Sequence, residues 1–500
     1  MRDDRVPVLV GVGQVRGNRG RTVQDAREPA ALVLDAVAAA ARDAAAPGLL
    51  ADLDAIDTVH VTSWAYADLA GRIAAAVGAR PAHTAGTRIG GHWPALLLER
   101  AAARIAAGES RVALIAGGEA QASRDALRKA GVDPAEAGWS TEPGGRPPLD
   151  PEDVGTPAMR AAGLVVPTRV YALFHSAFRH ALGLAPEAAA ARSAELYAAF
   201  TQVAARNPAA WNPRERSADD VGTARPGNRM VCEPYPLALN AMPRVDQAAA
   251  VVVTSLAAAR AHGVPEDRIV GVRGGAGAAD SADVPARPSL GRSPALADVL
   301  DRCLAGVPAA ELDVVDVYSC FPVVPELVAE HLGLPVTAVA GVTGGHNAFG
   351  GPLSSYTLHA LVAVTHRLRA GARLALVHGN GGFLTHQQAL LLSRDPAPYA
   401  GDPEPRLVGR AGPERVDPPD TGEARVEAAT VEHGRDGAPA QAFLVARTPT
   451  GARFAASTPP GDASAARALS LYRCGPPSEI VGTTVRFRRS GAHIVVEESS

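Results

Sequence analysis

Two stretches of the chain share one pattern, and this repeat limits the folds that the chain can adopt. The first stretch runs from Gly90 to Gly118 and the second from Gly350 to Gly382. Each reads as a glycine-rich turn, an apolar helix that ends at a glycine, a buried strand, and a second glycine-rich turn. Repetition on this scale predicts two duplicated α/β halves whose glycine turns meet at a shared site.

Length, charge and cysteine content narrow the class of protein. A chain of 500 residues is too long for one ordinary core, so we expect several packing units. The net charge of −3 offers no basic surface for nucleic acid or an anionic membrane. The N-terminus has no apolar targeting segment and no run long enough to span a membrane, so we expect a cytoplasmic protein. Four widely spaced cysteines, and histidines without ligand spacing, predict no metal site.

Local patterns divide the chain into parts. Residues 1–290 form a first half, with an inserted loop domain at about 123–236 where proline, glycine and charge become frequent. Residues 291–395 form a second half. Short alternating runs in 405–500 predict a small β-barrel domain, after a proline-rich linker at 395–425. In the two halves, alternating strands and helices predict a mostly parallel sheet covered on both faces.

The elements that these patterns predict can be stated by residue range. We expect core strands at 8–12, 56–61, 112–116, 248–254, 269–272, 312–317 and 373–378. We expect helices at 29–42, 95–107, 170–182, 187–205, 294–303 and 353–368. In the C-terminal part we expect strands at 425–431, 442–447, 452–457, 480–488 and 493–497.

An ordered set of motifs resembles the thiolase superfamily. The set is VGVGQ, a GG turn followed by a helix and AGG, VDQAAAVVVTS, DVYSCFP, GGHNAFGGP and HGNGG, and it spans roughly residues 5–395. It is similar in particular to thiolase-like proteins that carry the name acetyl-CoA acetyltransferase and an additional C-terminal domain. The resemblance implies a duplicated five-layered αβαβα core, an inserted loop domain and a small, OB-like C-terminal domain. It also implies a role in lipid metabolism, with a coenzyme A thioester as substrate or ligand and no covalently bound cofactor.

The chain departs from the family where thiolases carry their reactive groups. The nucleophilic cysteine of the family, at a helix N-terminus that lowers a thiol pKa, corresponds to Gly91 or His92. The histidine of the family's Gly-His-Pro motif corresponds to Gly351. The second thiol corresponds to Val377 or His378. Without a thiolate no acyl-enzyme forms by the usual route, so we do not expect ordinary thiolase activity.

Four side chains are candidates for a rebuilt site. Tyr318 is a candidate proton donor or enolate stabiliser, and His378 a candidate acid or base. His92 is a candidate base or oxyanion donor at a helix N-terminus, and Cys320 a displaced nucleophile or acid. For each, the alternative is packing: a satisfied core tyrosine, a small buried cysteine, a histidine that fills space.

The glycine turns are candidates for binding a thioester oxygen. Gly91 and Gly351 mark the first turns, and the N–H groups from Asn380 through Gly381 form a possible oxyanion hole. The alternative is that these glycines only permit tight turns. We interpret His346 and Asn347 as loop residues, and Tyr356 as a weaker candidate for the same cavity.

The inserted region supplies candidates for the phosphates of coenzyme A. Arg124 and Arg169 are the residues that we select, with solvated surface charge as the alternative.

Three functions remain open from the sequence. The first is an acyltransferase-like enzyme of acyl-CoA thioesters with a rebuilt site. The second is a retro-aldolase of the same fold that cleaves a hydroxyacyl-CoA, with the C-terminal domain contributing to acyl-CoA binding. The third is a protein that binds coenzyme A without catalysis. Thiolases are generally dimers or tetramers, and an added domain can block that surface, so the sequence leaves a homodimer and a monomer both open.

Overall fold

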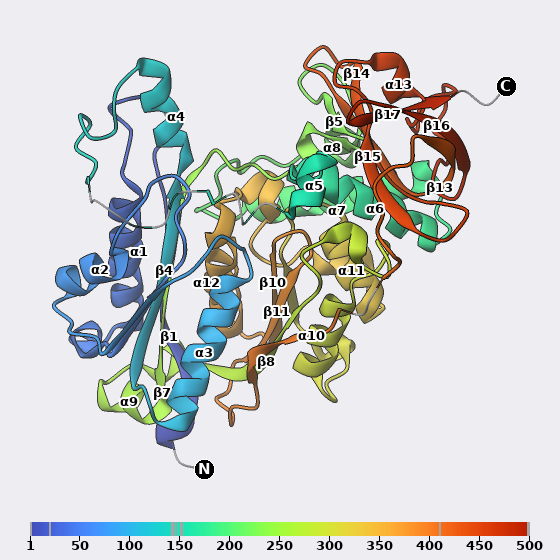
Figure 1. Cartoon of the computed structure of the whole chain (residues 1–500). Coiled ribbons are helices and arrows are strands. Elements are labelled where there is room, and N and C mark those ends of the chain that lie inside the picture. The colour runs from blue at the N-terminus through green and yellow to red at the C-terminus, as the bar shows by residue number, and fades with distance from the viewer. Residues whose placement is uncertain are drawn as a thin grey trace.

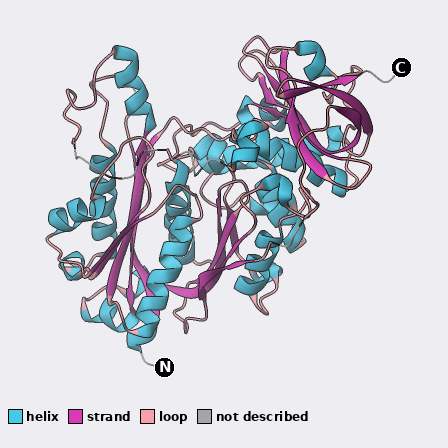
Figure 2. Ribbon diagram, viewed as in Figure 1, coloured by secondary structure: helices cyan, strands magenta, loops and turns pink. Residues whose placement is uncertain are grey.

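The fold has a large sheet with helices on its faces and a smaller sheet at the C-terminal end (Figure 1, Figure 2). The computed structural model describes residues 3–19, 22–141, 145, 147, 149–150, 153, 155–409 and 412–497. Among these residues, no helix is both long and apolar enough to cross a membrane.

The elements of the first half surround the inserted region. The first half holds β1 Pro7–Arg16, α1 Pro29–Ala44, β2 Ala55–Thr58, α2 Leu69–Val77, β3 His83–Gly86, α3 Trp93–Ala107, β4 Val112–Ala120, α4 Gln121–Ala130, β7 Asp246–Ser255 and α9 Leu256–Ala261. The inserted region holds α5 Pro157–Ala161, α6 Pro167–Ala181, α7 Pro186–Ala205, α8 Ala218–Gly222, β5 Met230–Cys232 and β6 Tyr235–Pro236.

The second half and the C-terminal part follow in order. The second half begins at β8, before the predicted residue 291, because β8 pairs with β1 across the junction of the halves. It holds β8 Val270–Ala279, α10 Pro294–Leu304, β9 Val314–Val317, α11 Val323–Leu332, α12 Tyr356–Arg369, β10 Leu374–Gly381, β11 His386–Ser393 and β12 Asp402–Leu407. The C-terminal part holds β13 Thr421–His433, β14 Pro439–Arg447, β15 Arg453–Ser457, α13 Ala463–Arg467, β16 Thr484–Ser490 and β17 His493–Glu497.

The two halves repeat one strand order. The order is β2-β4-β7-β1 in the first half and β9-β10-β11-β8 in the second. In both, the first pair is parallel and the next two pairs are antiparallel. β1 and β8 join the halves at Val8↔Gly271 and Leu9↔Val270. The sequence repeat therefore corresponds to a structural duplication.

The prediction of a mostly parallel sheet was wrong. β11 follows β10 through the short turn at 382–385, and two strands joined this way are antiparallel. β7 likewise runs antiparallel to both β4 and β1. The alternation of strands and helices describes only β2, β3 and β4 in the first half and β9 and β10 in the second.

Two central helices place the glycine turns between the halves. α3 and α12 contact each other, and each packs on β7 of the first half and β10 of the second (Figure 1). α1 covers the outer face of the first half, and α10 covers that of the second. α3 has Pro94 in its first turn and ends at Gly108, which adopts a φ of 75° that favours glycine.

The C-terminal sheet has the strand order β15-β14-β13-β16-β17. Its end strands are not paired with each other; within the described part of the chain, a hydrogen bond of 3.1 Å between Ser457 Oγ and His493 Nδ1 links them. Strand pairing therefore does not close the predicted barrel. In addition, part of the predicted linker is not irregular, because β12 pairs with β8 and extends the core sheet.

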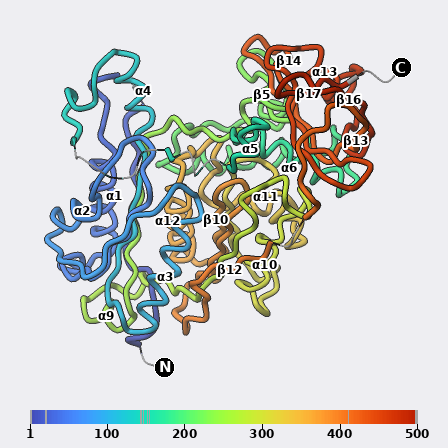
Figure 3. The backbone as a smooth tube through the Cα atoms, viewed as in Figure 1, coloured from blue at the N-terminus to red at the C-terminus, as the bar shows by residue number. Residues whose placement is uncertain are grey.

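The C-terminal sheet packs on the inserted region (Figure 3). α6 lies against β13, and Phe443 of β14 belongs to the same apolar cluster as Phe174 of α6. The buried Arg179 of α6 binds both carboxylate oxygens of Glu479, at 2.5 and 2.9 Å. The C-terminal part is thus joined to the core by shared apolar packing as well as by ion pairs.

Candidate functional site

The glycine turns of the two halves meet at a cavity of about 340 Å³. A Cβ atom at Gly379 would lie 3.0 Å from the Cα atom of His92, so the two turns are in backbone contact. Six of the predicted site residues line this cavity, namely Gly91, Tyr318, Cys320, Gly351, Asn380 and Gly381. The convergence predicted from the repeat is therefore present.

Tyr318 occupies the space in which a side chain at position 91 would lie. It follows β9, which ends at Val317. A Cβ atom at Gly91 would be 2.5 Å from the Tyr318 hydroxyl oxygen and still closer to its ring. Real Cβ atoms do not approach other atoms this closely, so residue 91 must be glycine while Tyr318 keeps this position. A phenol thus lies at the N-terminus of α3, at the position aligned with the family's cysteine.

The Tyr318 hydroxyl is a proton donor at neutral pH. Burial raises its pKa well above the ordinary value, and the nearby Cys320 adds to the shift. The hydroxyl donates a long hydrogen bond of 3.3 Å to the carbonyl oxygen of Leu353. A bond of this length is weak, so a substrate oxygen can replace its acceptor.

His346 lies beside the position of the missing family histidine. It belongs to the π-helical turn Gly345–Phe349, and its Cδ2 atom is 3.3 Å from where a Cβ atom at Gly351 would be. The backbone N–H of Ser319 donates to its Nδ1 atom at 3.3 Å. Burial lowers the pKa of the imidazole, so the ring is neutral and its proton is assigned to Nε2.

The Nε2–H group of His346 is a donor without an acceptor among the described residues, although it is buried. The ring stacks on Tyr356 with centroids 3.6 Å apart and meets the edge of the Tyr318 ring at 4.3 Å. This packing fixes the ring, and His346 lines the cavity. An orphan buried donor here suits an oxygen of a bound ligand.

A chain of hydrogen bonds orients the amide of Asn380. His378 Nε2 lies 2.8 Å from Gln387 Oε1, and Gln387 Nε2 donates to Asn380 Oδ1 at 2.7 Å. Asn380 Nδ2 then donates to the Tyr171 hydroxyl at 2.8 Å. Because burial lowers the pKa of His378 to about 4, the histidine is neutral and acts as the first donor of the chain.

Cys320 lines the cavity as a protonated thiol. Burial raises its pKa to about 12. Hydrogen bonds from the Tyr171 side chain, from the backbone of residues 320–321 and from the Asn380 side chain oppose that shift. Asn380 Nδ2 lies 3.9 Å from its sulfur. The geometry therefore does not supply a thiolate at this position at neutral pH.

Asp153, from the inserted region, adds a carboxylate to the cavity wall. Two guanidinium nitrogens of Arg88 hold its Oδ1 atom, at 2.7 and 2.8 Å. Its Oδ2 atom is buried and has no hydrogen-bond partner within the described part of the chain. An ion-paired carboxylate with one free oxygen is suited to accept a proton.

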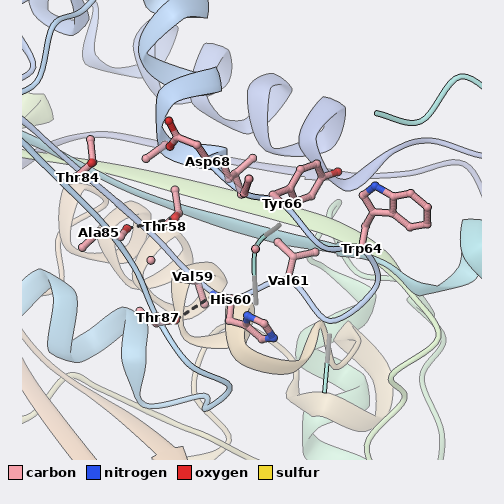
Figure 4. Close-up of a pocket in the computed structure, with 15 residues that line it drawn as sticks. Thr58, Val59, His60, Val61, Trp64, Tyr66, Asp68, Thr84, Ala85 and Thr87 are labelled. Carbon is pink, nitrogen blue, oxygen red and sulfur yellow. Dashed lines mark hydrogen bonds between the residues drawn. The ribbon is translucent and has the colours of Figure 1, made fainter. Parts of the chain in front are cut away.

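A second hollow, of about 290 Å³, lies where the parallel strands β2 and β3 end (Figure 4). Trp64, Tyr66 and His60 are among its lining residues. None of the predicted site residues lines it. It is therefore separate from the cavity at Tyr318.

Comparisons with known proteins agree with this geometry. Residues 411–492 match the family described as the thiolase-like protein type 1 additional C-terminal domain. The chain is similar to a monomeric SCP2-thiolase-like protein type 1 from Mycobacterium smegmatis, with 27% identity, 100% of each chain covered and a TM-score of 0.81. Comparison with curated protein sequences gives no match.

The chain has a thiolase-like fold and carries an additional C-terminal domain.

Two more distant structures share the fold. One is the Ltp2-ChsH2(DUF35) aldolase, with 18% identity over 78% of this chain and 98% of that one, and a TM-score of 0.57. The other is the dimeric peroxisomal thiolase of Saccharomyces cerevisiae, with 14% identity over 79% and 98%, and a TM-score of 0.56.

Four predicted residues of this thiolase-like protein do not line the cavity. His92 is buried behind Gly381 and stacks on His386 with centroids 4.8 Å apart. His378 lies behind Asn380, as the hydrogen-bond chain shows. Arg124 is exposed on α4, and its Nη1 atom lies 3.5 Å from the carbonyl oxygen of Thr62. Arg169 binds Glu432 at 2.7 Å and lies over the ring of Phe443.

Sequence reasoning missed four residues that shape the site of this thiolase-like protein. They are His346, Asp153, Tyr171 and Gln387. The sequence around His346 indicates only a loop, because a single π-helical turn has no sequence periodicity of its own. The preceding Gly344-Gly345 pair was the available signal, since both glycines adopt a positive φ that places this turn in the cavity wall.

Proposed function

We propose that this thiolase-like protein binds an acyl-CoA thioester in the Tyr318 cavity and cleaves or forms a carbon–carbon bond without a thiolate. The reaction that we propose is a retro-aldol cleavage of a β-hydroxyacyl-CoA, or its reverse. The observation that carries the proposal is the Tyr318 phenol at the place where position 91 would carry a nucleophile. A phenol there donates a proton or a hydrogen bond but forms no acyl-enzyme.

The proposed cleavage uses three side chains. The free Oδ2 atom of Asp153 accepts the proton of the β-hydroxyl group as the bond between the α and β carbons breaks. The electrons of that bond move into the thioester as an enolate, and its oxygen is stabilised by the His346 Nε2–H and the Tyr318 hydroxyl. The protonated Asp153 then gives this proton to the α carbon of the enolate, which restores the carboxylate, and the products are a shorter acyl-CoA and an aldehyde or ketone.

The Asn380 amide supports the same chemistry from the opposite half. Its Nδ2 donors are aimed by Gln387 and lie on the cavity wall. An aldolase that is 18% identical shares the fold, but a fold hosts many reactions, so the side chains in the cavity decide the chemistry. Acyl transfer through a cysteine is less compatible, because the Cys320 pKa is raised to about 12.

The experiment is a turnover assay with a matched pair of variants. Purified protein is incubated with β-hydroxyacyl-CoAs of increasing chain length, and the shorter acyl-CoA is quantified by mass spectrometry. We expect turnover by the native chain, and a fall in kcat of roughly 100-fold in Tyr318→Phe and in Asp153→Asn. Cys320→Ser serves as the control and keeps at least half of the native rate.

Two results would contradict the proposal. One is thiolysis of a β-ketoacyl-CoA by free coenzyme A that is lost in Cys320→Ser, because that reaction needs a sulfur nucleophile. The other is turnover of the β-hydroxyacyl-CoA at the native rate in Tyr318→Phe.

A further inference from the structure

A wide groove is lined by residues of the inserted region and of the C-terminal part. It has a volume of about 1180 Å³ and lies apart from the cavity at Tyr318. Three segments contribute its lining residues: 222–237, mostly in the inserted region, 433–439 at the turn between β13 and β14, and 467–475 from the end of α13 onward. Both the inserted region and the additional domain are therefore needed to form it.

Positive charge gathers in this groove. Five arginines line it: Arg225, Arg229, Arg435, Arg467 and Arg473. The acidic lining residues are Glu233 and Asp436. Both carboxylate oxygens of Glu233 are already used, because they accept from His433, the Ser470 hydroxyl and the Leu471 N–H at 2.7 to 2.9 Å.

Most of this charge has no anionic partner in the described part of the chain. Arg225 pairs with Asp219 and Asp220 and is neutralised. Arg229 and Arg473 donate to backbone carbonyl oxygens, which hold the guanidinium in place but leave its charge. Arg435 and Arg467 are exposed. Within the described residues, neither guanidinium has an ion pair with a carboxylate or a hydrogen bond to a backbone carbonyl oxygen. Like charges that line one groove repel one another unless an anion lies between them.

An aromatic ring lies at the same groove. Tyr472 is 40% exposed, which is unusual for a tyrosine in this chain, and it lies next to Arg473. The groove is much larger than a single phosphate needs, and its volume is somewhat above the roughly 300–1,000 Å³ of typical sites for small organic ligands. Guanidinium groups bind phosphate oxygens in pairs, and an exposed aromatic ring stacks on a planar base.

We propose that this groove is a binding site for a nucleoside polyphosphate. The arginines bind the phosphates, and Tyr472 stacks on the base. Two sources share this chemistry, a free nucleotide and the nucleotide portion of coenzyme A. The proposal does not depend on the reaction assigned to the Tyr318 cavity, because none of the groove residues lines that cavity.

Binding is tested by isothermal titration of the full chain with ADP at low salt. We expect the Kd for ADP to rise about tenfold in each of Arg435→Ala and Arg467→Ala, and more in the double variant. Both residues are exposed, so the variants retain the fold. Arg80→Ala, which changes an exposed arginine between α2 and β3, is the matched control and leaves the Kd unchanged.

A second pair of ligands tests the aromatic contact. Tyr472→Ala is expected to raise the Kd for ADP about tenfold and to leave the Kd for inorganic pyrophosphate unchanged, since pyrophosphate has no base. The proposal is overturned if ADP does not bind at millimolar concentration, or if the Kd is the same in the native chain and the double arginine variant.

Competition identifies the source of the nucleotide. If coenzyme A displaces ADP, and the double arginine variant loses affinity for both, the groove holds the nucleotide portion of coenzyme A. If ADP and coenzyme A bind at the same time, the groove holds a free nucleotide. Turnover by Tyr318 is measured separately, so failure of the groove proposal is distinct from failure of the proposed reaction.

Discussion

At the scale of single residues, Tyr318 and Gly91 depend on each other's size. The phenol lies where a side chain at position 91 would be, so each residue restricts the other. The sequence indicates only that Gly91 stands where the family carries a nucleophilic cysteine. In the structure, the phenol of Tyr318, from the second half of the chain, occupies the space that the cysteine side chain would fill.

Double substitution tests this mutual dependence. Gly91→Ala is expected to lower the free energy of unfolding by about 1–3 kcal/mol, because the new methyl group overlaps the Tyr318 ring. The double variant Gly91→Ala/Tyr318→Ala has no ring at position 318. Its free energy of unfolding should therefore equal that of Tyr318→Ala alone. Urea unfolding measures both. Gly86→Ala, where the nearest atom would be at an ordinary 3.6 Å, is the control. If the double variant loses as much free energy of unfolding as the two single variants together, the proposed contact is refuted.

The pH dependence of turnover separates a phenol from a thiolate. Burial holds the Tyr318 pKa far above neutrality, so its hydroxyl stays protonated between pH 7 and 10. A mechanism that used the Cys320 thiolate, with a pKa raised to about 12, would instead gain about tenfold in rate with each pH unit. We therefore expect kcat to show no such rise over this range in a steady-state assay.

Gln387 is a positioning residue for Asn380. Gln387→Leu removes the donor to Asn380 Oδ1 and leaves His378 Nε2 without its acceptor. We expect the free energy of unfolding to fall by about 1–3 kcal/mol. Since the amide is no longer aimed, we also expect kcat to fall roughly ten- to 100-fold while KM changes little. A drop in stability with an unchanged kcat would leave Gln387 with a purely structural role.

At the scale of elements, α6 connects the additional domain to the cavity. Tyr171 lies on the cavity side of α6, and Arg179 lies two turns further along and binds Glu479 of the additional domain. Arg169, predicted to bind phosphate, instead binds Glu432 of β13. The additional domain thus holds the helix that forms part of the cavity wall.

Glu479→Gln is expected to lower the free energy of unfolding at pH 7 by about 2 kcal/mol. Arg179 is buried and would lose its charge partner, while Glu479 is a third exposed and partly screened. Burial raises the Glu479 pKa, but the hydrogen bond and charge of Arg179 outweigh that effect and lower it below its usual 4.5. The contribution is therefore present above pH 4.5 and is lost as the pH falls through the lowered pKa. Denaturant unfolding of both proteins at pH 7, 5 and 4 should show the difference shrinking; a difference that grows on acidification contradicts the assignment.

Local signals predicted most elements but not their pairing. Proline in the first turn and a glycine after the last turn located α3 within two residues, because both act on the backbone itself. Strand direction depends on which distant segment lies alongside, and neither β7 nor β11 carries a signal for it. For the same reason β12 appeared to be part of a linker, since its partner β8 lies far away in the sequence.

At the scale of the whole molecule, the additional domain and the second half share one apolar cluster. Phe443 and Val445 of β14 belong to the same cluster as Tyr318 and Phe349 of the core. The additional domain also has an apolar cluster of its own, but its unfolding would expose apolar surface of the core as well, because the packing at β14 is shared.

We therefore expect one cooperative unfolding transition for the full chain. All four tryptophans precede the additional domain, so their fluorescence reports on the core, whereas far-ultraviolet circular dichroism also reports on the C-terminal sheet. The two signals should give coincident urea midpoints. Separate midpoints would mean that the additional domain is an independent unit.

The candidate site was predicted in outline. The glycine turns placed Tyr318, Cys320 and Asn380 at one cavity, because the duplication brings the same turn of each half together. The roles of individual side chains were not predictable in this way. Which of His92, His346 and His378 faces the cavity depends on packing between the halves, and only His346 does so.

Hydrogen exchange at the α carbon of a bound thioester shows whether this cavity forms an enolate without a thiolate. A saturated acyl-CoA is incubated with the protein in deuterium oxide, and deuterium at the α carbon is followed by mass spectrometry. We predict exchange in the native chain and in Cys320→Ser, strongly slowed exchange in Tyr318→Phe, and no acyl group covalently attached to the protein. Exchange that requires Cys320, or an acylated protein in the same spectra, would contradict the claim.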